Sequence, residues 1–250
     1  MNNLVHGLWI GKFTPLELLT LHSFLDHGAE FWLWTYDIPK GLPIPQGVVI
    51  KDGNEILPKE KIFVYPEGMV YGQCSGTVVG FSEWFRYKVL YEYGGWWSDM
   101  DVTCLKHLDL IDTDYFFRTH GVLSVVGNIM KCPPKSELMK LCFKEAEATI
   151  DEQTDDMYEA IRILGYYVKF LDLEKYIRKN ICPFDEVWLI DPFYSEGDYG
   201  DGKTSSAAIP EEWHFIHWMH SFCKNTMPKA GSTFCKLLEK YDIQQNTILL

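Results

Sequence analysis

The sequence predicts an α/β fold, with a mainly parallel central sheet flanked by helices. Residues 2–10 form an apolar run that predicts a buried strand, and residues 30–37 form a second run, rich in aromatic side chains. Between the two runs, residues 14–28 carry the signals of a helix. Because strand, helix and strand follow one another directly, they predict a βαβ unit, and such units build parallel sheets.

The helix between these strands has both a start and a stop signal. Thr14 can cap its first turn, Pro15 suits the first helical position, and Glu17 can complete a capping box with Thr14. Gly28 stands where such a helix should end.

The ends of the first two strands predict the place of a binding site. Ligands on parallel sheets bind beyond the carboxyl ends of the strands. Trp9, Ile10 and Gly11 end the first strand, and residues 35–37 end the second. We therefore expect these residues to lie near a pocket.

Further elements follow along the chain. Phe81, Trp84, Phe85 and Val89 recur at helical spacing, and Gly94 with Gly95 should end that helix. Strands are expected at 48–52, 114–119, 122–130, 185–191 and 214–219, and helices at 77–93, 135–149 and 155–164. Residues 195–207 are rich in glycine and polar side chains, which predicts a mobile loop.

Length and charge limit the classes of function. A chain of 250 residues without repeats fits one domain. Lys and Arg number 23 against 35 Asp and Glu, which gives a formal net charge of −12. This balance argues against nucleic acid as a partner, because such binding depends on clustered basic side chains. An acidic protein can still bind a phosphate ligand through a metal cation.

The cysteines and the apolar runs bear on the compartment. Seven scattered cysteines without a C-x-x-C pair favour reduced thiols over a disulfide framework or a zinc site. The N-terminus lacks the pattern of a signal peptide, and no apolar run is long enough to span a bilayer. These features predict a cytoplasmic protein without a transmembrane segment and leave the oligomeric state open.

Two carboxylates, Asp99 and Asp101, follow the glycine pair and Trp96-Trp97. In an extended segment, side chains two residues apart point to the same side. Their repulsion is tolerable with a cation, water or a shared proton between them, and Mg²⁺ or Mn²⁺ prefers such oxygen ligands. Read alone, the pair could also be a solvated turn.

The segment "SEWFRYKVLYEYGGWWSDMDV", residues 82–102, resembles the signature of DXD glycosyltransferases with a GT-A fold. It resembles in particular the sugar-binding region of glycosyltransferase family 32 and, more distantly, the glucosylating bacterial toxins. The opening segment, residues 3–37, is also similar to the start of these enzymes. The resemblance implies one Rossmann-like GT-A domain over residues 1–250. Its first half, residues 1–130, would bind the nucleotide-sugar and the metal. Its second half, residues 131–250, would face the acceptor and contain the mobile loop 195–207.

The resemblance also implies an activity. It is the transfer of a hexose or pentose from a UDP- or GDP-sugar to a glycan hydroxyl, dependent on Mn²⁺ or Mg²⁺ and with retention at the anomeric carbon. Since we find no well-placed carboxylate nucleophile, we expect a front-face mechanism in which the diphosphate assists deprotonation of the acceptor.

The site residues are carried over position by position. Asp101 would bind the metal directly, and Asp99 would hold the ribose and the water shell of the metal. Arg86 and Glu83 would grip the donor sugar, although the family usually has aspartate where Glu83 stands. Because Glu83 and Arg86 lie three residues apart on one helix, they could instead form a plain helical ion pair.

Other donor contacts follow from the same resemblance. Trp9 would stack on the base, with Ile10 beside it. The remaining donor-binding positions are Trp97, Asn128 and Trp218. Without the resemblance, the sequence favours a core position for Trp9, leaves core packing open for Trp97, and allows Asn128 to be a turn residue.

The segment 213–222 offers a third metal ligand. His214, His217 and His220 are spaced three apart, so that in a strand His217 faces away from the other two. The resemblance favours His217 as the ligand. A histidine in an aromatic strand can also be a hydrogen-bonded core residue.

Two other classes of function stay open from the sequence. Residues 99–103 also fit the D-x-D-x-T motif of haloacid-dehalogenase-type phosphatases, in which Asp99 would attack phosphorus and Asp101 would act as acid and base. Those enzymes place the motif after an early apolar strand, which is not its position here. A non-catalytic module that binds sugar or metal is the third class.

Overall fold

The structure is a computed structural model that describes residues 3–37, 44–67, 74–120, 123–179, 209, 211–218, 220 and 231–244. The strand expected at 185–191 and the loop expected at 195–207 lie outside these ranges.

The described strands are β1 (Leu4–Leu8), β2 (Glu30–Thr35), β3 (Val49–Asp52), β4 (Gly95–Ser98), β5 (Val102–Cys104), β6 (Phe116–His120), β7 (Leu123–Cys132), β8 (Ile177–Arg178) and β9 (Phe215–His217). The described α-helices are α1 (Pro15–Asp26), α2 (Val79–Tyr93), α3 (Glu137–Thr149), α4 (Glu159–Phe170) and α6 (Thr233–Lys240). Short 3₁₀ turns are η1 (Gly53–Glu55), η2 (Lys59–Lys61), η4 (Leu108–Leu110) and η5 (Glu174–Tyr176).

Seven of the described strands form the central sheet, in the order β3-β2-β1-β4-β7-β6-β8. Strands β3, β2, β1 and β4 are parallel neighbours, whereas β7 runs antiparallel to both β4 and β6. The prediction of a mainly parallel sheet is therefore confirmed. Strands β5 and β9 form a separate antiparallel pair.

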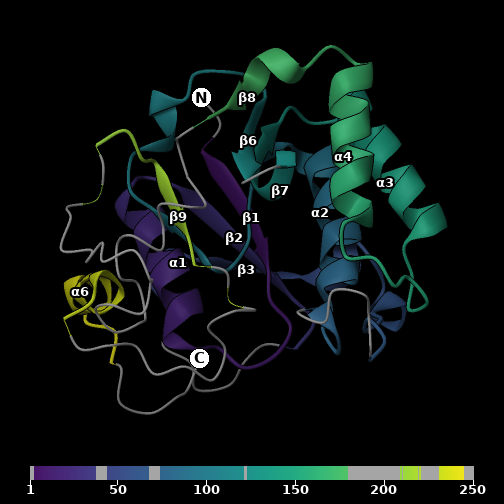
Figure 1. Cartoon of the computed structure of the whole chain (residues 1–250). Helices are drawn as coiled ribbons and strands as arrows, with labels where there is room; N and C mark the ends of the chain where they lie inside the picture. The colour runs from purple at the N-terminus through teal and green to yellow at the C-terminus, as the bar shows by residue number, and fades with distance from the viewer. Residues whose placement is uncertain are drawn as a thin grey trace, which may run out of the picture.

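Helices cover both faces of the sheet (Figure 1). Helices α2, α3 and α4 pack on one face, around a core that includes Trp34, Trp97 and Met130. Helix α1 packs on the other face with β9 and α6, around a core that includes Phe31 and Trp96. Adjacent residues of one strand, such as Trp96 and Trp97, thus enter different cores, as expected where a strand is buried on both faces.

Helix α1 begins as its sequence predicts. The Thr14 hydroxyl accepts a hydrogen bond from the Leu16 N–H, and Oε2 of Glu17 accepts one from the Thr14 N–H. This capping box satisfies backbone donors that the first turn of a helix leaves free. Gly28 follows the helix with a φ of +77°, a conformation that suits glycine.

The reversal from α2 into β4 depends on glycine. Gly94 has a φ of +65° and Gly95 a φ of +85°. The Gly94 carbonyl accepts a hydrogen bond of 3.0 Å from His6 Nε2 in β1. Because Trp34 Nε1 donates to His6 Nδ1 over 3.1 Å, the proton of the neutral ring lies on Nε2. Burial lowers the pKa of His6 to about 4, so the ring stays neutral at neutral pH.

Several elements differ from the sequence expectations. Helix α4 starts at Glu159 rather than at 155, because Asp156 accepts from the Tyr158 N–H in a turn ahead of the helix. It ends at Phe170, beyond the expected end at 164. Strand β8 and helix α6 were not predicted, since both are short. No helix in the described ranges is long and apolar enough to cross a membrane.

We predict that Gly94→Ala destabilises the protein strongly. A Cβ at Gly94 would overlap the backbone of Pro134, and its φ disfavours any side chain. The expected loss is roughly 3 kcal/mol or more in the free energy of unfolding. Gly165→Ala in α4 is the matched control, because its Cβ would meet no atom within 4 Å. Thermal unfolding tests both, and equal midpoints for the two variants would contradict this account of the turn.

Candidate active and metal site

The two carboxylates lie in a turn rather than in a strand. Asp99 follows β4, and Met100 and Asp101 form the turn that leads into β5. The expectation of an extended segment at Asp99–Asp101 is therefore wrong. The turn lies beyond the carboxyl end of β4, beside the end of parallel β1, where ligands of such sheets bind.

Neighbouring elements hold the backbone of this turn. The Asp99 N–H donates to the carbonyl of Asn128 in β7 over 2.8 Å. The carbonyl of Met100 accepts from the hydroxyl of Thr20 in α1, also over 2.8 Å. The central sheet, through β7, and helix α1 thus both contribute to the position of the carboxylates.

Asp101 is held by the segment that includes β9. Its carbonyl accepts from the Trp218 N–H over 2.9 Å, and its Oδ2 accepts from the His220 N–H over 2.9 Å. In the β5–β9 pair, His217 lies opposite Val102, the residue after Asp101. This register places His217 Nε2 at 3.3 Å from Asp101 Oδ2. Residues more than 110 positions apart therefore meet at one carboxylate.

The side chain of Asp99 has two donors on the same oxygen. Arg86 Nη2 lies 3.0 Å from Asp99 Oδ1, and Trp97 Nε1 donates to Oδ1 over 2.7 Å. The guanidinium also lies 5.2 Å from the centre of the Trp97 ring. Burial raises the pKa of Asp99, and the charge of Arg86 opposes that rise. The second oxygen, Oδ2, has no such donor among the described residues.

Asp101 titrates in the opposite direction. Burial works to raise its pKa, but His217 and the His220 N–H outweigh burial and hold the pKa of Asp101 at about 2. Asp101 is therefore ionised at neutral pH.

Asp99, Asp101 and His217 can hold a metal ion. Each offers one ligand atom, and these atoms all lie within 4.8 Å of one another. Two carboxylate oxygens and an imidazole nitrogen suit Mn²⁺ and also allow Mg²⁺. Nδ1 of His217 is buried without a partner in the described part of the chain, so the ring position depends on Nε2 and its surroundings.

Two further carboxyl groups near the site are buried and neutral. Glu83 lies in α2, one helical turn before Arg86, and burial raises its pKa to about 8. Glu17 in α1 has a pKa of about 8 for the same main reason. The ion pair described for Arg86 is with Asp99, not with Glu83. The alternative of a plain helical ion pair is thus not what the structure shows.

The expected aromatic contacts differ in their exposure. Trp9 is partly exposed, its ring lies 6.0 Å from the His220 ring, and its Nε1 donates to the Lys12 carbonyl. Ile10 is partly exposed beside it. Trp97 is 1% exposed and Trp218 is 3% exposed.

The indoles of Trp97 and Trp218 serve as internal supports. Trp97 donates to Asp99, as above, and Trp218 Nε1 donates to the Thr103 hydroxyl over 2.7 Å. The structure therefore places them beneath the turn at 99–101, with little surface open to a ligand.

Sequence reasoning missed Arg118 and His120 in β6. The ring of His120 lies 5.7 Å from that of His217, and Arg118 Nη1 donates to Asn128 Oδ1 over 3.2 Å. Burial, then the charges of His217 and Arg118, lower the pKa of His120 to about 3. A charged residue inside the apolar run 114–119 was the available signal.

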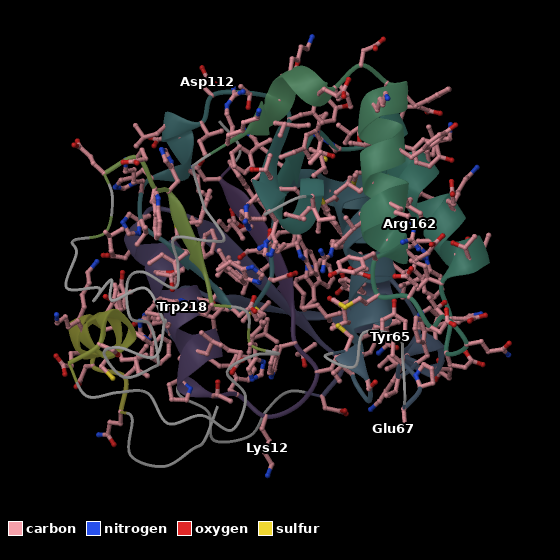
Figure 2. The ribbon with its side chains drawn as sticks, viewed as in Figure 1. Lys12, Tyr65, Glu67, Asp112, Arg162 and Trp218 are labelled. Carbon is pink, nitrogen blue, oxygen red and sulfur yellow. The ribbon has the colours of Figure 1, made fainter. Side chains whose placement is uncertain are left out.

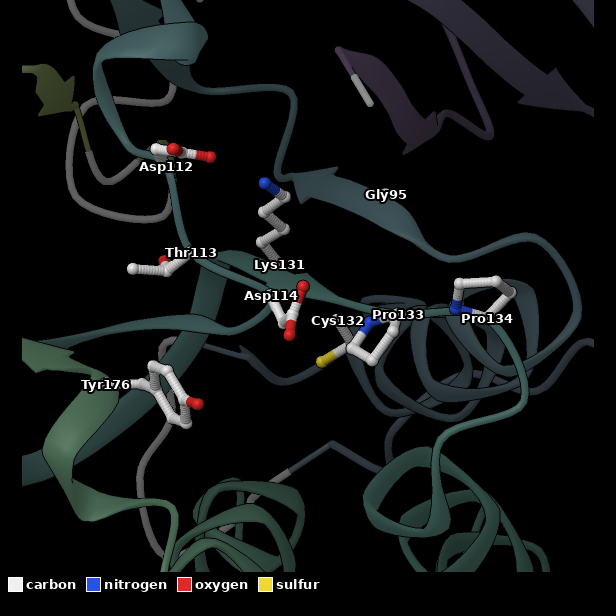
Figure 3. Close-up of a pocket in the computed structure, with 9 residues that line it drawn as sticks. All are labelled: Gly95, Asp112, Thr113, Asp114, Lys131, Cys132, Pro133, Pro134 and Tyr176. Atoms are coloured by element: carbon white, nitrogen blue, oxygen red, sulfur yellow. The ribbon is translucent and has the colours of Figure 1, made fainter. Parts of the chain in front are cut away.

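A cavity of about 490 Å³ lies at the other end of the sheet, lined in part by Gly95 at the start of β4 and Lys131 near the end of β7. Figure 3 shows Lys131 between Asp112 and Asp114 in this cavity. Figure 2 shows Asp112 at the opposite end of the molecule from Lys12, which follows β1. This cavity is therefore separate from the carboxylate site.

We predict that Gly127→Ala displaces Arg86 and raises the pKa of Asp99. A Cβ at Gly127 would lie 2.7 Å from Arg86 Nη1, the flexible end of a long side chain. Moving the positive charge away removes what opposes the rise in pKa. Carboxyl NMR titration of the metal-free protein measures this directly.

A double-mutant cycle with Arg86→Met provides the control. Gly127→Ala should have no further effect on the pKa of Asp99 once Arg86 is gone. If the pKa rises by the same amount in both backgrounds, Gly127 does not act through Arg86.

The region around the turn at residues 99–101 matches a known protein family. Residues 77–117 match the family described as "Glycosyltransferase sugar-binding region containing DXD motif". This span contains Glu83, Arg86, Asp99 and Asp101. No curated protein matches the sequence.

Two of the solved structures with a similar fold are glycosyltransferases. One is the galactosyltransferase LgtC in complex with donor and acceptor sugar analogs, with a TM-score of 0.51 and 10% identity over 95% of each chain. The other is the apo-form glycosyltransferase GlyE of Streptococcus pneumoniae TIGR4, with a TM-score of 0.51 and 13% identity. That match covers 98% of this chain but 61% of GlyE. Residues 77–117 are therefore similar to the DXD-containing sugar-binding region of glycosyltransferases, and the chain has the GT-A fold of these solved glycosyltransferases.

Proposed function

We propose that this protein is a metal-dependent glycosyltransferase. It moves a sugar from a nucleotide-sugar donor, a UDP- or GDP-sugar, to a hydroxyl of a glycan acceptor, with retention of anomeric configuration. The observation that carries the proposal is the cluster of Asp99, Asp101 and His217 beyond the carboxyl ends of β1 and β4. The family match around the same carboxylates supports it.

Charge explains why a cation belongs in this reaction. The chain has a formal net charge of −12, and the carboxylates would repel a donor diphosphate. When bound, Mn²⁺ or Mg²⁺ supplies Lewis-acid stabilisation of the charge on the departing diphosphate. Asp101, ionised at neutral pH, and His217 would hold the ion.

Asp99 has a different part in the proposal. Its Oδ1 is occupied by Arg86 and Trp97, which fixes the plane of the carboxylate. Oδ2 is then the oxygen left to accept from a ribose hydroxyl or from water on the metal. Arg86 pairs with this side chain, the charge of Asp99 acts on Glu83, and the Asn128 carbonyl accepts from the Asp99 N–H, so we assign these three residues to contacts with the sugar. Trp9, at the end of β1, would stack on the base.

Retention by a front-face route is consistent with the buried carboxyl groups. Glu83 and Glu17 have pKa values near 8, so neither is an anionic nucleophile at neutral pH. In the proposed step, the bond from the anomeric carbon to the diphosphate oxygen breaks as a bond to the acceptor oxygen forms on the same face. The acceptor proton passes to the departing diphosphate.

We predict that one nucleotide-sugar releases free nucleotide in the presence of Mn²⁺ and that EDTA abolishes the release. Asp101→Asn should lower the rate by about 100-fold or more, because several kcal/mol of charge stabilisation depends on the metal. Asp112→Asn, which alters a carboxylate in the distant cavity, is the matched control and should keep the wild-type rate. A panel of UDP- and GDP-sugars, read by nucleotide release, identifies the donor.

Three results would count against the proposal. Release that persists in EDTA would rule out a dependence on the metal. An inverted anomer in the NMR spectrum of the product would rule out a retaining mechanism. Cleavage of a simple phosphate ester, with no release from any donor, would favour the phosphatase alternative.

A further inference from the structure

Arg118 is a buried arginine that the proposed reaction does not use. It lies in β6 and is 1% exposed. The pairing of β6 with β7 shifts register on both sides of Arg118. Such bulges redirect side chains and are common beside active sites. The strand is therefore locally irregular where its one arginine turns inward.

The guanidinium of Arg118 contacts two side chains at once. Nη1 lies 3.2 Å from Asn128 Oδ1, and Nη2 lies 3.2 Å from His120 Nδ1. Arginine carries five donors in a planar fork and no acceptor. Asn128 Oδ1 and His120 Nδ1 must therefore both be hydrogen-bond acceptors, which excludes the flipped amide of Asn128 and the other tautomer of His120.

This requirement fixes the amide of Asn128. Its Oδ1 faces Arg118, so Nδ2 is directed elsewhere as a donor. Nδ2 is buried and has no hydrogen-bond partner among the described residues. A buried donor without a partner costs free energy, which a ligand oxygen would recover. The same residue accepts the Asp99 N–H through its carbonyl, so the amide lies close to the metal-binding turn.

The same requirement fixes the tautomer of His120. Because Nδ1 accepts from Arg118, the neutral ring carries its proton on Nε2. The ring lies 5.7 Å from that of His217, at an interplanar angle of 66°. His120 thus packs edge to face against the histidine of the metal cluster, in an orientation set by Arg118.

We propose that Arg118 is a positioning residue of the site. Its guanidinium holds the Asn128 amide so that Nδ2 donates to an oxygen of the donor substrate, in the diphosphate or the sugar. It also fixes the orientation of the His120 ring, which packs against the His217 ring and so orients it. This inference rests on the proposed function and specifies how the site recognises the oxygen-rich part of its donor.

The first test replaces Arg118 by lysine, which keeps the charge and loses the fork. Calorimetric titration with Mn²⁺ should show an affinity about 10- to 100-fold weaker, as for other residues that orient metal ligands. The kcat for the donor should fall as well. Arg178→Lys is the matched control, because Arg178 is the register partner of Arg118 on β8 and donates to the Lys175 carbonyl. It should change the Mn²⁺ affinity by less than about twofold.

A second variant, Asn128→Asp, keeps the oxygen that Arg118 binds and removes the Nδ2 donor. It is therefore expected to fold even if Arg118→Lys does not. The KM for the donor should rise by about tenfold or more, because a hydrogen bond to a charged or polar oxygen is lost. Mn²⁺ affinity should be retained, since the charge of the site becomes more negative.

The outcomes separate this inference from the proposed function. Suppose that the wild type binds Mn²⁺ and turns over the donor. If a folded Arg118→Lys variant then has the same Mn²⁺ affinity and the same kcat as Arg178→Lys, only the positioning role is overturned. An unchanged donor KM in Asn128→Asp overturns the role assigned to Nδ2. If wild type itself neither binds Mn²⁺ nor uses any donor, both proposals fail together.

Discussion

The repulsion between Asp99 and Asp101 is the constraint on which the rest of the site depends. Their ligand atoms lie within 4.8 Å of each other. Two charges about 5 Å apart repel by roughly 3 kcal/mol at an effective dielectric constant of about 20. The fold offsets this with different partners for each carboxylate, Arg86 and Trp97 for Asp99 and the segment at His217 for Asp101. Burial raises the pKa of Asp99 against the charge of Arg86, whereas His217 and the His220 N–H outweigh burial and lower the pKa of Asp101. A divalent cation would satisfy both carboxylates at once.

Helix α1 links the first strands to this turn. Its N-terminal capping box fixes where the helix begins, and its buried hydroxyls bond to the backbone further along the chain. Thr20 donates to the Met100 carbonyl, and Ser23 accepts from the Cys104 N–H over 2.9 Å. Each hydroxyl also donates within the helix, Thr20 to the Leu16 carbonyl and Ser23 to the Thr20 carbonyl, so the contacts to residues 100 and 104 are additional bonds that tie the helix to the turn and to β5. The βαβ unit and the site are therefore parts of one structure.

The sequence predicted the elements with strong periodicity or strong caps, and it named the carboxylates and Arg86. It could not show that residues 99–101 form a turn, because spacing alone does not fix the backbone angles. It also could not separate Trp9, which is partly exposed, from Trp97 and Trp218, which are buried, since all three are tryptophans near strand ends. The tertiary contacts of a side chain decide these points, and residue type does not report them.

The contact between β6 and β7 was the least accessible to sequence reasoning. Arg118 and Asn128 lie ten residues apart in two strands whose register is irregular, so no simple period predicts that they meet. What the sequence did offer was Arg118 within one largely apolar run and Asn128 within the next. Buried polar residues in such runs need partners, and pairing them with each other is a rule that could be applied to other chains.

The most direct test of the central claim is a crystal structure with Mn²⁺ and the nucleoside diphosphate, measured with anomalous scattering at the manganese edge. We predict one strong anomalous peak bounded by Asp99, Asp101 and His217, with the diphosphate on the same ion. A peak elsewhere, for example beside Asp112 and Asp114, or none at all in crystals that hold the nucleotide, would contradict the account.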